Sequence, residues 1–283
     1  MTRLSLTKHH GLGNDFLVTF HPGVGGDDEA ADLARRLCDR RRGIGADGLL
    51  IAESAAGKAA SMTLFNADGS RAEMSGNGIR CFAQALAMRR GGDGPPVLDP
   101  QLIETDAGDK LVTLAATDDP ASLLATVDMG AVEPIDEPAR WSVLGCHPDR
   151  PVAHLSLGNP HSVVGVDDVE VVDLVDLGGK VPDVNLEIIE PGPEPNAVTM
   201  RVHERGAGVT EACGTGACAS AFAARSWGLV ASTAPEVVVH MTGGSATVSF
   251  DDDRPGVVTL TGPATLVASI EIHVDLDTGG DLA

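Results

Sequence analysis

A cysteine flanked by glycines is the residue of this chain best placed to do chemistry. Cys213 lies in the segment 211–219 (EACGTGACA), and the alanine-rich run that follows, to about Trp227, predicts a helix. Glycines free several backbone N–H groups at a helix start, so we expect Cys213 at a helix N-terminus. The helix dipole favours a thiolate there, and such positions lower a cysteine pKa from about 8.5 into roughly the 3.5–7.5 range. The same N–H groups can hold a carboxylate.

A second segment repeats this pattern about half a chain away. Residues 73–81 (EMSGNGIRC) place Ser75 ahead of two glycines, and a helical run to Arg90 follows. Both segments read Glu, any residue, Ser or Cys, Gly, any residue, Gly, and then an apolar helix. Two helix N-termini with matched small nucleophilic side chains indicate two similar halves that face each other across one ligand.

Further glycine-rich motifs occur along the chain in a fixed order. They are HGLGNDF (10–16), GIGADG (43–48), NADGS (66–70) with GNGIR (76–80), GNPH (158–161), ERGAG (204–208) and ACGTG (212–216). Together, over a stretch from about residue 4 to residue 272, they closely resemble the diaminopimelate epimerases, a family of amino-acid epimerases that use no cofactor. The chain departs from that family at two positions: Ser75 stands where the family has its first catalytic cysteine, and Gly48 where it often has a Gln.

The resemblance implies a reaction at the Cα of diaminopimelate, in which one group removes the proton and another returns a proton to the opposite face. Carried over, Cys213 and Ser75 transfer the protons, while His161 and Glu204 tune their pKa values. Arg205 would clamp a substrate carboxylate with two hydrogen bonds. The helix N-termini would bind the α-carboxylate and stabilise the developing carbanion. The other substrate contacts that the resemblance implies are Asn14, Asn66, Asn159 and Asn185, Glu204 itself, and the donors of Gly76, Asn77, Gly214 and Thr215.

Ser75 leaves three explanations open: a working epimerase of Ser/Cys type, an engineered Cys→Ser trap, or a diverged relative with another reaction. A serine hydroxyl is a far weaker acid than a thiol, so it acts as a base only if a neighbour takes its proton. The related hydroxyproline epimerases carry serine at this site within different flanking motifs, which favours the first explanation.

Two other functions compete with epimerisation. In a non-catalytic amino-acid or anion-binding protein, both glycine loops would only hold a carboxylate, yet binding alone would not need Cys213 with His161 and Glu204. An isomerase of the phenazine-biosynthesis type would use an acidic general acid/base and would lack the ACGTG loop.

The composition excludes several classes of cofactor and partner. Pyridoxal phosphate needs a Schiff-base lysine, and the four lysines, Lys8, Lys58, Lys110 and Lys180, all lie outside a phosphate-loop context. The five cysteines are odd in number and scattered, which disfavours a disulfide framework and a structural zinc site, so we expect no metal. A formal charge of −21 argues against nucleic acid or an anionic membrane as partner. Without a long apolar segment, we expect a cytoplasmic protein, with a homodimer possible.

The length of 283 residues suits two domains of about 130. We predict an α+β fold with two pseudo-symmetric domains, each a mostly antiparallel sheet or barrel around a central helix, at 76–90 and 213–227. The first domain takes residues 1–121 with 266–283, and the second takes 122–265, because the last strand would cross back. The tail 275–283 is expected to fray. Other helices are expected at 27–40 and 169–178, and strands at 3–8, 15–20, 49–52, 61–65, 97–105, 109–116, 122–129, 152–157, 162–166, 185–190, 197–203, 236–241, 245–250, 257–261 and 266–274.

Overall fold

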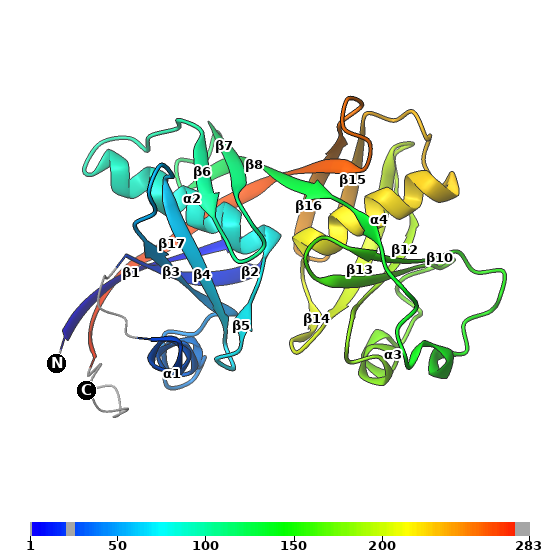
Figure 1. Ribbon diagram of the computed structural model, residues 1–283, viewed down its shortest axis with the longest axis horizontal. Coiled ribbons are helices and arrows are strands. Elements are labelled where there is room, and N and C mark those ends of the chain that lie inside the picture. Colours follow the sequence, from blue (N-terminus) through cyan, green and yellow to red (C-terminus); the bar gives the residue numbers. More distant parts are fainter. Residues whose placement is uncertain (1, 21–25, 275–283) are drawn as a thin grey trace. The chain divides into compact units, whose positions relative to one another are not determined.

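The computed structural model describes residues 2–20 and 26–274 (Figure 1). The expected frayed tail lies outside the described residues. The chain forms two compact units, one from residues 1–126 with 263–283 and the other from residues 127–262, where the sequence placed the limits at 121/122 and 265/266. Among the described residues, no helix combines the length and apolar character needed to cross a membrane.

The first unit is a sheet whose successive pairings alternate between antiparallel and parallel. β1 and β2 form a hairpin, β2 lies parallel to β3, β3 is antiparallel to β4, β4 is parallel to β6, and β6 is antiparallel to β7. Helices supply the crossovers that the parallel pairs require. The elements are β1 (Thr2–Gly11), β2 (Asn14–Thr19), α1 (Asp27–Cys38), β3 (Gly48–Glu53), β4 (Ala60–Asn66), β5 (Arg71–Ala72), α2 (Gly76–Gly91), β6 (Gln101–Glu104) and β7 (Lys110–Ala116).

The second unit repeats this succession of pairings. β10 is antiparallel to β11, β11 is parallel to β12, β12 is antiparallel to β13, β13 is parallel to β15, and β15 is antiparallel to β16. The helices α3 and α4 take the places that α1 and α2 have in the first unit. The predicted pseudo-symmetry is therefore confirmed. The elements are β10 (Val152–Ser156), β11 (Pro160–Gly165), α3 (Leu174–Lys180), β12 (Asn185–Pro191), β13 (Ala197–Glu204), β14 (Gly208–Thr210), α4 (Gly214–Trp227), β15 (Glu236–Met241) and β16 (Gly244–Phe250).

The remaining elements connect the units or precede β10. β8 (Ser122–Ala131) and β17 (Val257–Val274) both run from one unit into the other, and β9 (Glu133–Pro134) pairs with β10. A short 3-10 helix, η1, covers Trp141–Leu144.

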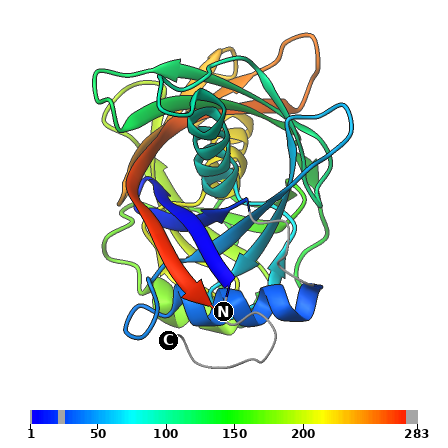
Figure 2. The same cartoon turned by 90° about the vertical axis from the view of Figure 1, so that its left-hand side faces the viewer.

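The central helices are buried on every side because strands surround them. In α2 every residue from Gly76 to Ala87 is buried, and Figure 2 shows this helix inside the strands of its unit. In α4 alanines and glycines make up most of the buried positions, which lets strands pack closely around the helix. By contrast α1 buries only one face, which includes Leu33 and Leu37, and lies outside the strands.

Three of the sequence predictions for secondary structure need correction. The strand expected at 97–105 is only the short β6, Gln101–Glu104. The helix expected at 169–178 begins only at Leu174, where Asp173 caps it by accepting from the Asp176 N–H. Earlier in that stretch side chains hold the backbone N–H groups of Val169 and Glu170, and such bonds compete with helix formation. The two strands expected at 257–261 and 266–274 are one strand, β17. Its proline, at position 263, lies between the part paired with β16 and the part paired with β1.

Candidate active site

The two glycine loops have the same local geometry, each within its own unit. Ser75 caps α2 with backbone angles φ −137° and ψ 120°, and its Oγ accepts from the Gly78 N–H at 3.0 Å. Cys213 caps α4 with φ −128° and ψ 115°, and its Sγ accepts from the Gly216 N–H at 3.4 Å. Both side chains therefore lie at helix N-termini, as the spacing predicts. Each N-terminus carries the partial positive charge that attracts a carboxylate.

A chain of hydrogen bonds fixes the amides beside Ser75. The Arg80 guanidinium donates to Asn77 Oδ1 at 2.8 Å, Asn77 Nδ2 donates to Asn14 Oδ1 at 3.1 Å, and Asn14 Nδ2 donates to Asp47 Oδ2 at 2.7 Å. The guanidinium at one end can only donate and the carboxylate at the other end can only accept. These two ends therefore fix which side-chain atom is the oxygen and which is the nitrogen in both Asn77 and Asn14. Arg80 is fully buried and also donates to the Gly76 carbonyl, so its positive charge lies directly behind the first turn of α2.

Asn14 is held by a strained hairpin turn and by Asp47. Leu12 and Gly13 have φ of 56° and 88° between the paired Gly11 and Asn14, which is the geometry of a type I′ turn. Among the described residues, Leu12 is the one residue other than glycine that has a positive φ, and this conformation costs about 1–2 kcal/mol. A turn kept at that cost places Asn14 at the start of β2.

Asp15 anchors the same corner. Its burial opposes ionisation, but hydrogen bonds from Arg40 and Lys8 outweigh that penalty and lower the pKa of Asp15. Arg40 also bridges to Asp47 Oδ1 at 2.7 Å. Asp47 thus contacts Arg40 through Oδ1, while its Oδ2 accepts from the Asn14 amide.

A second chain of contacts reaches Cys213 from β12. Glu187 Oε1 lies 2.6 Å from His161 Nδ1, His161 Nε2 lies 3.0 Å from Asn159 Oδ1, and Asn159 Nδ2 donates to Thr215 Oγ1 at 3.2 Å. Thr215 Oγ1 lies 3.5 Å from Cys213 Sγ. The parallel register of β11 and β12 pairs residue 161 with residue 185, which puts His161 and Glu187 on the same side of the sheet. A Cβ at Gly216 would lie 2.6 Å from Glu187 Oε1, so any larger residue there would displace the Glu187 carboxylate.

The prediction of a lowered pKa for Cys213 is wrong for this structure. Burial, and then the charges of Glu204 and Glu187, raise the Cys213 pKa well above its ordinary value, although bonds from Thr215 and Gly216 act in the opposite direction. A helix dipole contributes typically 0.3–1 kcal/mol at exposed sites, which cannot offset full burial between two carboxylates. The resting thiol is therefore protonated. Burial also raises the pKa of Glu187, against the pull of His161.

Asn185 joins β12 to the turn that carries Glu204 and Arg205. Its Oδ1 accepts from the Arg205 N–H at 2.8 Å and its Nδ2 donates to the Pro160 carbonyl at 3.0 Å. Thr210 donates to Glu204, and the Arg205 side chain is exposed. An exposed guanidinium on a braced turn is well placed to bind a ligand carboxylate.

One predicted contact, Asn66, and one departure from the family pattern, Gly48, lie outside these chains. Asn66 donates to Ser70 Oγ at 3.0 Å, and no described contact links it to Asn14 or Asn77. Gly48 packs so closely that a Cβ there would lie 2.8 Å from the Phe65 carbonyl oxygen. The larger side chain often found at that position in the resembled family would need the backbone to shift.

Sequence reasoning missed the roles of Glu187, Asp47 and Arg80. Arg80 and Asp47 lie inside quoted motifs, but nothing in those motifs shows which group they contact. Glu187 had a signal, since it is the one charged residue in the otherwise apolar run after Asn185 (NLEII), at the alternate position that shares Asn185's side of the strand.

The trio His161, Glu187 and Cys213 could also hold a metal. Their ligand atoms lie within 4.8 Å of one another, and the donor types are those that zinc accepts. His161 Nδ1 and Glu187 Oε1, however, already form a 2.6 Å hydrogen bond with each other. The trio is therefore held together without a metal.

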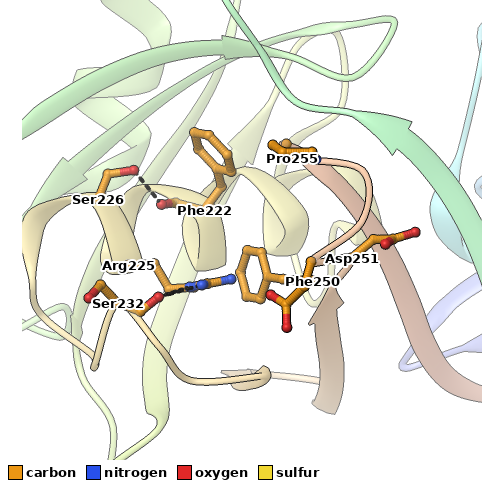
Figure 3. Close-up of a pocket in the computed structure, with 9 residues that line it drawn as sticks. Phe222, Arg225, Ser226, Ser232, Phe250, Asp251 and Pro255 are labelled. Atoms are coloured by element: carbon orange, nitrogen blue, oxygen red, sulfur yellow. Dashed lines mark hydrogen bonds between the residues drawn. The ribbon is translucent and has the colours of Figure 1, made fainter.

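A surface hollow of about 380 Å³ lies on the second unit, away from these residues. Its lining includes Phe222, Arg225, Phe250 and Asp251 and none of the sequence-based site residues (Figure 3). The Arg225 guanidinium lies 3.9 Å from the centre of the Phe250 ring and donates to the Ser232 carbonyl. Because this cation already has partners, the hollow does not compete with the Cys213 site as a place for chemistry.

Comparisons with known proteins agree with the motifs. A family model described as diaminopimelate epimerase matches residues 6–135 and 154–267. A diaminopimelate epimerase of Synechococcus elongatus is 37% identical over 286 residues, which cover 94% of this chain and 97% of that protein. One of Desulfitobacterium hafniense is 38% identical, with coverage of 93% and 96%.

Solved structures share the fold at low sequence identity. A hydroxyproline epimerase of Agrobacterium vitis with bound trans-4-hydroxy-L-proline has a TM-score of 0.72 at 18% identity, over 100% of this chain and 95% of that one. A structure titled as a predicted epimerase of Pseudomonas aeruginosa has a TM-score of 0.73 at 17% identity, over 97% and 100%. At such identities the two structures establish the fold alone.

Proposed function

The chain belongs to the diaminopimelate epimerase family, and we propose from this premise that it converts LL-diaminopimelate into meso-diaminopimelate by proton transfer at Cα. Members of the family are amino-acid epimerases that work without a cofactor. The observation that carries the proposal for this chain is the pair of matched helix caps, Ser75 and Cys213, on two units built to one plan. The product would feed lysine and peptidoglycan precursor biosynthesis.

Epimerisation needs an acid and a base on opposite faces of one carbon, and we assign these roles to Cys213 and Ser75. On one face, the thiolate of Cys213 removes the proton or its thiol returns one. On the other face, Ser75 donates a proton from its hydroxyl, and it acts as a base only when a neighbour accepts that proton. The two groups that we assign to the reaction therefore differ in strength as acids and bases.

The helix N-termini and Arg205 supply the positive charge that the substrate carboxylates require. Backbone N–H groups at the starts of α2 and α4 would hold the α-carboxylate, and the buried charge of Arg80 supports the first of them. As the α-proton leaves, the same donors stabilise the carbanion. Arg205 would bind the distal carboxylate through two hydrogen bonds. Asn14, Asn66, Asn159 and Asn185 remain proposed substrate contacts, with Glu204 as the group that tunes an acid or base.

A binding protein without activity is the second candidate, and Ser75 is the observation that favours it. Proton NMR in D2O with LL- and meso-diaminopimelate separates the two candidates. An epimerase replaces the Cα–H signal with deuterium and forms the other isomer, whereas a binder only broadens or shifts the ligand signals. Binding without exchange would overturn the proposed function. A cytoplasmic location and a homodimer stay predictions, the second open to sedimentation analysis.

A further inference from the structure

Glu187 is a buried carboxylate whose position the fold alone does not explain. Its side chain is fully buried on β12, and one oxygen lies 2.6 Å from His161 Nδ1. The other oxygen, Oε2, has no hydrogen-bond partner among the described residues. A buried polar atom without a partner costs about 1–3 kcal/mol, and a charged one costs more. An apolar residue would suit a strand core better, so the carboxylate calls for a functional reason.

We propose that Glu187 is a positioning residue, which orients His161 and stabilises its protonated form so that His161 can accept the proton of Cys213. The inference rests on the proposed function, because it names what makes the Cys213 thiol a base. Glu187 would act through His161 and would not touch the substrate.

The hydrogen-bond chain from His161 to Cys213 has two complete arrangements, which differ by the net transfer of one proton from Cys213 to His161, a turn of the Asn159 amide and a reversal of the Thr215 hydroxyl. In the first, Cys213 S–H donates to Thr215 Oγ1, the Thr215 hydroxyl donates to Asn159 Oδ1, and the Asn159 amide donates to a neutral His161 Nε2. In the second, His161 Nε2–H donates to Asn159 Oδ1, Asn159 Nδ2 donates to Thr215 Oγ1, and Thr215 donates to the thiolate. In the structure Asn159 Nδ2 faces Thr215 and Oδ1 faces His161 Nε2, which is the amide orientation that the second arrangement uses, so the first arrangement requires the amide to turn over.

The transfer is balanced. The S–H bond of Cys213 breaks and an N–H bond forms at His161 Nε2, so a neutral pair becomes a thiolate and an imidazolium with no change in total charge. The Gly216 N–H, 3.4 Å from Sγ, and the Thr215 hydroxyl then donate to the thiolate. In both arrangements Nδ1–H of His161 donates to Glu187, which fixes the tautomer and leaves Nε2 as the atom that gains or loses a proton.

The charges around the thiol explain why the carboxylate is needed. Glu187 on β12 and Glu204 on β13 both face Cys213, and both oppose a thiolate. A buried imidazolium supplies the counter-charge, and it is stable at a fully buried position only beside an anion. Glu187 therefore has two opposed effects on Cys213: a direct repulsion, and an indirect stabilisation of the thiolate through His161.

These two effects predict opposite outcomes for one substitution. Glu187→Gln keeps the shape and the acceptor but removes the charge. If the action through His161 dominates, alkylation of Cys213 by iodoacetamide between pH 6 and 8, followed by mass spectrometry of its peptide, should slow about tenfold or more, since an opposite charge shifts a pKa by about 1–3. If direct repulsion dominates, alkylation should become faster. Glu187→Asp should restore part of the loss, and the matched control Glu190→Gln, which is on the same strand, should change nothing.

The epimerase assay is an independent test of the role of Glu187. Glu187→Gln should lower kcat and move the lower limb of its pH profile, with KM little changed, and it should have almost no further effect in a His161→Gln background. Faster or unchanged alkylation in a folded Glu187→Gln protein overturns the inference. A parent protein that shows no exchange of the substrate, but whose Cys213 alkylation still depends on Glu187, refutes the proposed function and leaves the role of Glu187 standing.

Discussion

Replacing Ser75 with cysteine tests the proposed chemistry most directly. The thiol should fit, because Cys213 occupies the same backbone geometry at the other cap with its sulfur 3.4 Å from the N3 N–H, where Ser75 Oγ lies at 3.0 Å. A thiol accepts this cap bond more weakly. Losing an N-cap side chain costs about 0.5–2 kcal/mol, so we expect at most about 1 kcal/mol of lost stability, or a few degrees in Tm.

The gain in turnover should be much larger. A thiol of pKa about 8.5 is a few per cent ionised at pH 7, so it can serve as base and acid, whereas a serine hydroxyl is essentially never ionised. Positioned general acid–base groups contribute typically 10²–10⁴-fold, and we expect Ser75→Cys to recover at least about tenfold in kcat.

Deuterium exchange at Cα, measured separately for each isomer, is the assay for Ser75→Cys. In the parent protein the isomer whose proton faces Cys213 should exchange readily and the other slowly, and the substitution should speed the slow one. The new thiol should also make the protein sensitive to mild oxidants in a way that dithiothreitol reverses. Equal exchange of both isomers in the parent, unchanged in the variant, would show that Ser75 is not the second acid/base.

Three further predictions test the remaining roles. Iodoacetamide should abolish activity through Cys213, with protection by substrate, and equal labelling of all five cysteines without loss of activity would exclude this role. Glu204→Gln should lower turnover and shift its pH profile, whereas Arg205→Lys should chiefly raise KM because an ammonium cannot replace the bidentate fork; identical defects would contradict both assignments. Asp47→Asn should raise KM several-fold by letting the Asn14 amide turn over, and an unchanged KM would mean that this amide does not contact the substrate.

The parts of the fold that depend on local signals could be predicted from the sequence. Glycine pairs after Ser75 and Cys213 mark the two caps, because only a small residue allows the loop to close on its own side chain. Apolar runs behind them mark the central helices. The start of α3 was not predicted because residues 169–172 form bends and turns ahead of the Asp173 cap. The length of β17 was not predicted because a proline suggests a break, whereas the strand continues through it from its pairing with β16 to its pairing with β1.

The electrostatics of the site could not be predicted because they depend on residues far apart in the sequence. A helix N-terminus alone predicts an acidic thiol at Cys213. The raised pKa instead follows from burial and from two carboxylates that β12 and β13 bring to the cap. Neither carboxylate belongs to the ACGTG loop, and the register that places Glu187 beside His161 is a long-range parallel pairing. Sequence spacing identifies which residue reacts, but not its protonation state.

The raised pKa of Cys213 is compatible with catalysis if the proton leaves for a partner inside the site. A protonated thiol at rest is an acid ready to reprotonate the carbanion, and the same thiol becomes a base only when His161 takes its proton. Burial raises the pKa of Glu187, and the contact with His161 acts in the opposite direction. The two protonation states that epimerisation requires at Cys213 would then differ by a transfer over a few ångströms within one unit.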